Sequence, residues 1–265
     1  MKILYIGDVM GEAGIKTVER ALPELVKEHS IDIVIAQSEN VSAGKGLSLE
    51  DYERLKRAGV HGFTGGNWTL HLDETHALLE DENAAVTRPA NYPEGTAGKR
   101  YKVLQTEQGS VLLVSLLGSI VGKDAERPVD NPLSCIDNIL NTLSIDDYEA
   151  IIINFHGDFS SEKVVIGQYL DGRVTAVVGD HWHVPTADAR VLKNGTAHIT
   201  DVGMCGSLDS SLGVKFESVL PRWRDGIQTR NILEEAGAMQ FNAVVIETNP
   251  ATNRAQSIRH IREIL

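Results

Sequence analysis

Two histidines that lie two residues apart, His181 and His183, are well suited to share one charged centre. On an extended chain, side chains with this spacing project to the same side, so the two imidazole rings would lie close together. The apolar, β-branched residues 174–178 predict a buried strand that opens into a loop at Gly179. The pair therefore follows the carboxyl end of a core strand, where open α/β sheets bind ligands. Taken alone, the same pattern also fits an ordinary exposed turn.

Other polar side chains follow predicted strands in the same way. Residues 2–6, 31–36, 60–63 and 150–155 are apolar enough to form buried strands, and each run leads into a polar segment. Each polar residue also has a simpler interpretation, as a helix cap, a solvated turn residue or a core histidine. Strand ends on one rim of a sheet converge, however, so these side chains are expected to meet in one pocket. They are Asp8, Glu39, Asn67 and His156.

This combination of oxygen and nitrogen donors is typical of sites for Mn, Fe or Zn and differs from calcium and thiolate sites. Six or seven donors are too many for one catalytic ion that keeps an open coordination position. Two ions about 3.5–4 Å apart that share a carboxylate would use them, and such a pair clamps a phosphoester and ionises an attacking water. The sequence therefore predicts a two-metal centre of the kind that acts on phosphoesters.

Length, cysteine content and net charge indicate which kinds of protein and which partners the sequence disfavours. The 265 residues fit a single domain, 1–265, with a possible small insertion around 118–148. Two widely separated cysteines argue against a disulfide framework and favour the cytoplasm. No signal peptide or membrane-spanning run is present, so we expect no membrane partner. A net charge of −12 opposes binding of long nucleic acid but permits a small anionic substrate when a metal supplies positive charge.

Periodicity and turn residues predict the remaining elements. Helices are expected at 15–29, 48–58 and 133–143, and Thr69 is expected to cap a further helix. Residues 103–105 and 111–117 predict an antiparallel hairpin. Residues 88–101 predict a surface loop that separates the two halves of the chain. Towards the end of the chain we expect strands at 195–201 and 243–247 and a basic helix at 254–265.

Several motifs give the chain a specific resemblance over nearly its whole length. It resembles the calcineurin-like metallophosphoesterases, and within them the YmdB-type branch of bacterial 2′,3′-cyclic-nucleotide phosphodiesterases. The motifs are Ile6-Gly7-Asp8-Val9-Met10-Gly11, Ser38-Glu39-Asn40 with Gly44-Lys45-Gly46, Gly66-Asn67, residues 88–96, Phe155-His156, Ser161-Glu162-Lys163, and the run 171–204 with His181, His183 and Thr200-Asp201-Val202-Gly203-Met204.

The resemblance implies an α/β fold, a four-layer α-β-β-α sandwich with two mixed sheets between helices. It implies two divalent or trivalent metal ions, Fe and/or Mn, and a small phosphodiester or nucleotide substrate that a metal-bridged hydroxide attacks. A homo-oligomer is compatible with the sequence, which leaves the oligomeric state open. The implied ligands of one ion are Asp8, Glu39, Asn40 and His183, and those of the other are Glu39, Asn67, His156 and His181, with Glu39 bridging.

One position departs from the family pattern. In the family, the residue after the asparagine of the Gly-Asn-His motif is a histidine that is thought to protonate the leaving oxygen. In this chain the residue at that position is Trp68. An indole donates one hydrogen bond but has no proton to transfer near neutral pH. His71 is an alternative acid, which would approach from a different backbone position. The departure raises a second hypothesis, a metal- and nucleotide-binding regulator or scaffold with weak or no catalysis, and a third, hydrolysis of another bond type.

Overall fold

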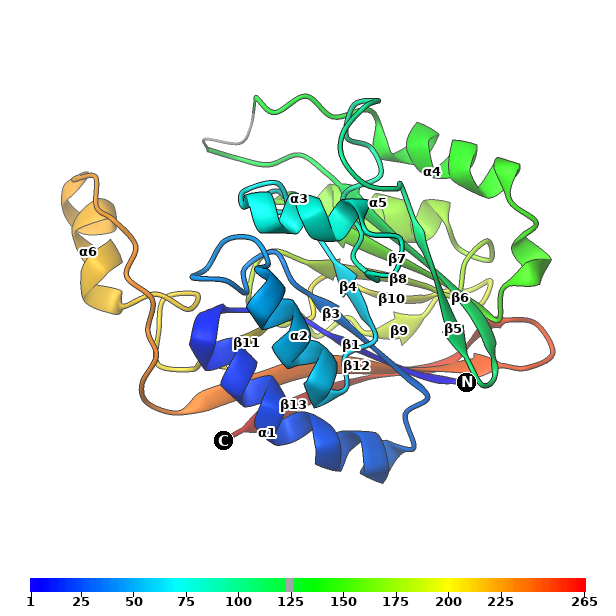
Figure 1. The fold of residues 1–265 in the computed structure, drawn as a ribbon, viewed down its shortest axis with the longest axis horizontal. Helices are drawn as coiled ribbons and strands as arrows, with labels where there is room; N and C mark the ends of the chain where they lie inside the picture. Colours follow the sequence, from blue (N-terminus) through cyan, green and yellow to red (C-terminus); the bar gives the residue numbers. More distant parts are fainter. Residues whose placement is uncertain (123–125) are drawn as a thin grey trace.

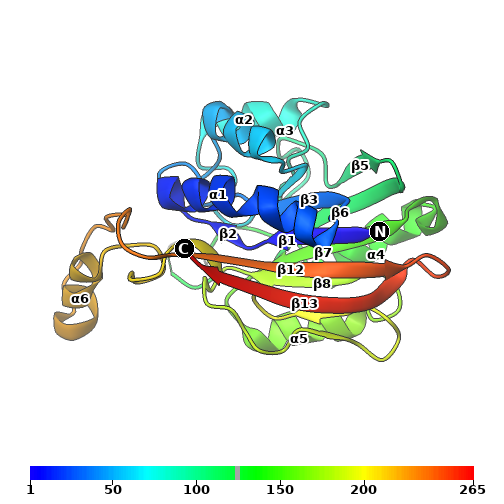
Figure 2. The same ribbon diagram turned by 90° about the horizontal axis from the view of Figure 1, so that it is seen from below.

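Two β-sheets pack face to face, and helices cover their outer faces, so the protein has four layers (Figures 1 and 2). The computed structural model describes residues 1–122 and 126–265. This is the α-β-β-α sandwich that the resemblance implied. Each sheet contains both parallel and antiparallel pairs, as expected for mixed sheets.

The first sheet has the strand order β2-β11-β12-β1-β3-β4, with β13 paired to β12. The second sheet has the order β5-β6-β7-β8-β10-β9. The strands of the first sheet are β1 (Lys2–Ile6), β2 (Asp8–Val9), β3 (Ile33–Gln37), β4 (Gly62–Thr64), β11 (Met204–Ser207), β12 (Met239–Asn249) and β13 (Arg254–Ile264). Those of the second sheet are β5 (Lys102–Thr106), β6 (Gly109–Leu117), β7 (Ala150–His156), β8 (Ala176–Asp180), β9 (Arg190–Val191) and β10 (Ala197–Ile199).

The described helices lie on the two outer faces, except α6. Figure 2 shows α1 (Gly11–His29), α2 (Leu49–Ala58) and α3 (Asp73–Glu80) on one side of the paired sheets and α5 (Ser160–Tyr169) on the other. Helix α4 (Pro132–Thr142) and the short 3-10 helix η1 (Ile145–Asp147) precede β7. Helix α6 (Phe216–Asp225) stands apart from the layers at the end of a long excursion (Figure 1).

Alternating apolar residues of β1 show how the layers form. Ile3 and Tyr5 belong to the apolar cluster between the sheets, whereas Leu4 and Ile6 belong to the cluster under the helices α1 and α2. Successive side chains of a strand point to opposite faces, so a central strand buried on both faces is apolar throughout. A third cluster joins α4 and α5 to the second sheet.

The predicted basic helix at residues 254–265 is wrong, because this segment is the strand β13. It forms ten antiparallel residue pairs with β12, from Gln240 with Ile264 to Asn249 with Arg254, with a register irregularity between Glu247 and Thr248. Ala255 and Ile258 both pack between the sheets, although they are three residues apart, because the irregularity adds a residue and reverses the alternation. That spacing of three resembles a helical period and accounts for the error.

Other local predictions have mixed outcomes. The hairpin of β5 and β6 is confirmed. Residues 88–101 form no helix or strand, but the predicted surface loop is wrong for residues 88–92, which are buried. Thr69 does not cap a helix, because α3 begins at Asp73 and the Thr69 hydroxyl donates to the carbonyl of Gly66. Of the proposed insertion around 118–148, residues 123–125 lie outside the described residues. None of the helices described here has the length and apolar character needed to span a membrane.

Candidate metal centre

The polar side chains predicted from strand ends meet on one rim of the two sheets. Asp8 begins β2 directly after β1, and His156 is the last residue of β7. Glu39 and Asn67 follow β3 and β4 by two and three residues, and His181 directly follows β8. The first four of these side chains are buried, and that of His181 is 20% exposed. Convergence of strand ends therefore brings together residues that span most of the sequence.

One group of donors surrounds His156. Its Nε2 lies 2.9 Å from Asn67 Oδ1 and 3.1 Å from Glu39 Oε1. The His181 ring is packed against it, with the ring centroids 4.4 Å apart. Glu39, His156 and His181 each offer a donor atom within 4.8 Å of the others. These four residues are the predicted ligands of one ion.

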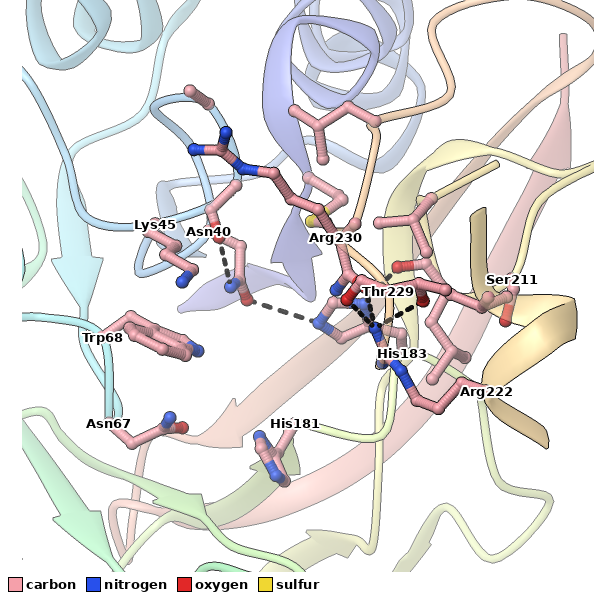
Figure 3. Close-up of a pocket in the computed structure, with 18 of the residues that line it drawn as sticks. Asn40, Lys45, Asn67, Trp68, His181, His183, Ser211, Arg222, Thr229 and Arg230 are labelled. Atoms are coloured by element: carbon pink, nitrogen blue, oxygen red, sulfur yellow. Dashed lines mark hydrogen bonds between the residues drawn. The ribbon is translucent and has the colours of Figure 1, made fainter. Parts of the chain in front are cut away.

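A second group surrounds His183. Its Nε2 lies 3.3 Å from Asn40 Oδ1, a contact visible in Figure 3, and 3.7 Å from Asp8 Oδ1. The two groups are joined, because the backbone N–H of His181 donates to Asp8 Oδ2 at 3.2 Å. Asp8, Asn40 and His183 are, with Glu39, the predicted ligands of the other ion. The structure thus brings together all seven predicted ligands in two neighbouring groups.

The Asp8 carboxylate provides a test of whether a cation fits here. Asp8 is fully buried, and within residues 1–122 and 126–265 its Oδ1 has no hydrogen-bond partner. Burial, together with the negative charges of Asp180 and Asp201, raises the pKa of Asp8 well above its usual value. A buried carboxylate oxygen that accepts no hydrogen bond is costly, and a metal ion bound to Oδ1 would remove that cost. The donor set therefore fits one or more cations.

The charges around His156 lead to the same conclusion. Burial lowers the pKa of His156, but the carboxylates of Glu39 and Asp180 outweigh burial and hold it well above its usual value. Burial raises the pKa of Glu39, but His156 outweighs that effect and the pKa is lowered. The acidic surroundings of the imidazole thus favour a positive charge at this position. A metal ion bound to Nε2 would supply this charge and release the proton.

The two loop histidines have unusual backbones. His181 has φ 102° and His183 has φ 62°, so the extended conformation assumed from the sequence is wrong. Positive φ is rare for residues other than glycine and is maintained only where the surroundings enforce it. Here the backbone N–H of Trp182 donates to Asp201 at 2.9 Å, and the fully buried Lys163 pairs with the same carboxylate at 2.9 Å. This buried ion pair fixes the turn that directs both imidazoles into the site.

Sequence reasoning missed Asp180 as a functional residue. Its Oδ1 lies 2.6 Å from Nδ1 of His156, and its Oδ2 accepts from the Tyr5 hydroxyl at 3.0 Å and from the side-chain amide of Asn154. A carboxylate on the far nitrogen of a histidine fixes the orientation of the ring and makes Nε2 a better ligand. Asp180 ends β8, so the strand-end signal that identified Asp8 applies to it equally well.

Beside this cluster lies a cavity of about 1060 Å³. The close-up in Figure 3 shows Asn40, Asn67, His181 and His183 among the residues that line it, with Trp68 next to Asn67. Trp68 is also connected to the cluster through its backbone, since its N–H donates to Glu39 Oε2 at 2.8 Å. Residues on and after α6 complete the far wall, among them Arg222, Trp223, Ile227, Thr229 and Arg230.

His71 lies close to Trp68, which occupies the position of the family's proton donor. An alternative general acid would have to lie in this region. The two rings meet edge to face with centroids 5.4 Å apart, and both residues line the cavity. His71 has no hydrogen bond to a predicted metal ligand among the described residues. A role for it as general acid stays a prediction.

Known proteins resemble this chain over nearly its whole length. A family model described as YmdB-like protein matches residues 4–261. A 2′,3′-cyclic-nucleotide 2′-phosphodiesterase of Bacillus subtilis is 36% identical over 261 residues, which cover 98% of this chain and 96% of that protein. A crystal structure of a phosphatase of Mycoplasma pneumoniae has a TM-score of 0.91 and 30% identity, and the match covers 100% of this chain and 93% of that chain.

A more distant structure shares the fold alone. The crystal structure of a 5′-nucleotidase of Candida albicans has a TM-score of 0.54 at 12% identity. The match covers 98% of this chain and 50% of that one.

Proposed function

The chain belongs to the YmdB-like protein family, and from this membership and the geometry of the cluster we propose that it is a metal-dependent phosphodiesterase. The substrates we propose are small phosphodiesters, 2′,3′-cyclic nucleotides among them. The observation that carries the proposal is the buried Oδ1 of Asp8, which accepts no hydrogen bond within the described residues and lies among oxygen and nitrogen donors from five strand ends. A relative that is named a 2′,3′-cyclic-nucleotide 2′-phosphodiesterase supports the substrate class.

The proposed site holds two metal ions, one in each group. Glu39 is the natural bridge, because its Oε1 lies 3.1 Å from His156 Nε2 in one group and its negative charge also acts on Asp8 and His183 in the other. Mixed nitrogen and oxygen donors favour Mn or Fe over Ca. Bound there, two ions would polarise the phosphoryl oxygens and make a water molecule acidic enough to attack phosphorus. The ligands proposed are Asp8, Glu39, Asn40, Asn67, His156, His181 and His183.

Two contacts within the chain hold predicted metal ligands in place. Asp180 holds His156 in one orientation through a 2.6 Å contact, and the N–H of Trp68 holds Glu39 through a 2.8 Å hydrogen bond. Holding donor groups in place before substrate binds lowers the cost of organising the transition state. The open cavity beside the cluster provides room for a nucleoside attached to the reacting phosphate.

The proposal also includes the cellular compartment of the protein and the class of its substrates. Both cysteines are free and buried, which supports a reducing compartment such as the cytoplasm. The net charge of −12 favours small substrates over long nucleic acid. The single-domain organisation and a homo-oligomeric assembly stay predictions.

Turnover of a panel of esters tests the function. Purified protein treated with a chelator is reloaded with Mn²⁺ or Fe²⁺ and assayed on bis(p-nitrophenyl) phosphate, 2′,3′-cyclic nucleotides and a carboxylic ester. We expect metal-dependent hydrolysis of phosphodiesters alone, and loss of that hydrolysis in His181→Ala with the melting temperature retained. Hydrolysis of the carboxylic ester only would support the hypothesis of a different bond type.

Trp68 favours one alternative function. The indole at the family's proton-donor position cannot protonate a leaving oxygen, so the chain could bind metal and nucleotide as a regulator or scaffold with weak or no catalysis. Tight nucleotide binding by the metal-loaded protein, with no turnover of any phosphodiester, would establish this alternative.

A further inference from the structure

Lys45 is a cation at the edge of the candidate metal centre that the proposed function does not use. Its side chain is exposed to the cavity, and its ammonium lies 3.9 Å from the centroid of the Trp68 ring (Figure 3). Lys45 forms no ion pair within the described part of the chain. In a protein of net charge −12, an uncompensated cation beside a cluster of carboxylates requires an explanation.

The loop that carries Lys45 is tied to the predicted metal ligands on both sides. The side-chain amide of Asn40 donates to the carbonyl of Gly44 at 3.0 Å, and the N–H of Gly46 donates to the carbonyl of Glu39. Both glycines have positive φ, 84° and 80°, a conformation that other residues rarely adopt. The position of Lys45 is therefore coupled to the cluster through three contacts, the third being Trp68.

Trp68 holds the ammonium without neutralising it. A contact between a lysine and the face of an indole at an exposed site is weaker than a charge-assisted hydrogen bond to a phosphate oxygen. An anion that enters the site can therefore draw the ammonium away from the ring. Arg222, in the far wall, is less available, because its guanidinium donates to Thr229 and Asn231.

We propose that Lys45 binds the leaving-group side of the phosphate and offsets the negative charge that develops on the leaving oxygen. This inference rests on the proposed phosphodiesterase function and assigns a residue to the task left open by Trp68. As the bond from water oxygen to phosphorus forms, the ester P–O bond breaks and its electron pair goes to the leaving oxygen. Water loses one proton and the leaving oxygen gains one from solvent, so the products are a phosphomonoester and an alcohol.

The first test measures binding of inorganic phosphate and needs no turnover. Calorimetric titration of the Mn²⁺-loaded protein is compared for wild type, Lys45→Met and Lys193→Met. Methionine keeps the length of the side chain and removes the charge, and Lys193 is an exposed lysine outside the residues that line the cavity. We expect Lys45→Met to bind phosphate about 10- to 100-fold more weakly, as for loss of one hydrogen bond to a charged group, and Lys193→Met to match wild type.

The second test separates the leaving groups. A nitrophenolate is stable near neutral pH, whereas a ribose alkoxide is strongly basic and gains more from a neighbouring cation. Lys45→Met should therefore reduce kcat on 2′,3′-cyclic nucleotides at least about tenfold more than on bis(p-nitrophenyl) phosphate, with Lys45→Arg intermediate. An equal loss on both substrates would overturn the leaving-group assignment.

Metal content and melting temperature distinguish this inference from the proposed function. Both should be unchanged in Lys45→Met, because Lys45 is exposed and is not a predicted ligand. Phosphate binding that depends on Lys45 in a protein that hydrolyses no ester would support the phosphate contact of Lys45, but it would overturn both the leaving-group role and the proposed function. Equal phosphate affinity in wild type and Lys45→Met, or no phosphate binding by the wild type, would overturn the inference.

Discussion

His156 is completely buried, and each of its two ring nitrogens contacts a carboxylate. His183, at the other end of the cluster, has a side chain that is 11% exposed and contacts the backbone carbonyl of Leu212. The first histidine ends a central strand of its sheet, and the second lies in a turn with positive φ. The protein therefore builds one half of the centre into its core and forms the other from loops. Binding of an ion should organise the His183 half more than the His156 half.

Glu39 links the two halves, so its replacement should have the largest effect. Two cations about 3.5–4 Å apart repel each other strongly unless an anion lies between them. We expect Glu39→Gln to lose at least one ion per chain, measured by elemental analysis after gel filtration, and to lose metal-dependent turnover. Two tightly held ions per chain in this variant would show that Glu39 does not bridge.

Replacing each histidine separately compares the two halves. His156→Ala leaves Glu39 and Asp180 as buried charges without their partner, and loss of one partner of a buried pair costs about 3–5 kcal/mol. His183→Ala and His181→Ala, at more exposed positions, should lower activity with a smaller change in stability. Chemical denaturation of the metal-free variants measures the difference. Equal unfolding free energies for His156→Ala and His183→Ala would mean that the two halves are equally preformed.

Asp180→Asn tests whether the enclosed half depends on its supporting carboxylate. The amide keeps the shape but removes the charge that orients His156, and loss of such a partner typically costs about 10- to 100-fold in metal affinity or activity. Competition with a fluorescent chelator measures the affinity of the ions. The matched control is Asp158→Asn, whose carboxylate lies 3.2 Å from the more exposed His181. We expect a smaller loss for it.

Trp68→His should have the smallest effect, and it is a gain. A histidine at this position restores a proton donor, which should raise the rate on 2′,3′-cyclic nucleotides by up to about 10²-fold and leave the rate on nitrophenyl esters unchanged. The gain is limited because imidazole fills less space than indole and holds Lys45 less well. A neutral Trp68→His with a harmful His71→Ala would instead identify His71 as the acid.

Local patterns in the sequence were sufficient to predict many of the residues of the candidate metal centre. Apolar runs that end in polar residues located Asp8, Glu39, Asn67 and His156, because a strand and the loop after it are encoded by neighbouring residues. The motifs around them indicated the family, which the comparisons confirm, and the four-layer fold that the structure shows. The assignment of individual ligands to two ions stays a prediction, although the side chains do meet in two groups.

Only the tertiary structure revealed the contacts between residues that are distant in sequence. Three such contacts depend on which strands and helices lie side by side in the fold. They are the pairing of Asp180 with His156, the Lys163–Asp201 pair under the histidine turn and the position of Lys45 over Trp68. The strand β13 was misread because its identity depends on pairing with β12 and on an irregularity in the register of that pairing. Burial and strand pairing are properties of the whole chain, so periodicity within one segment cannot determine them.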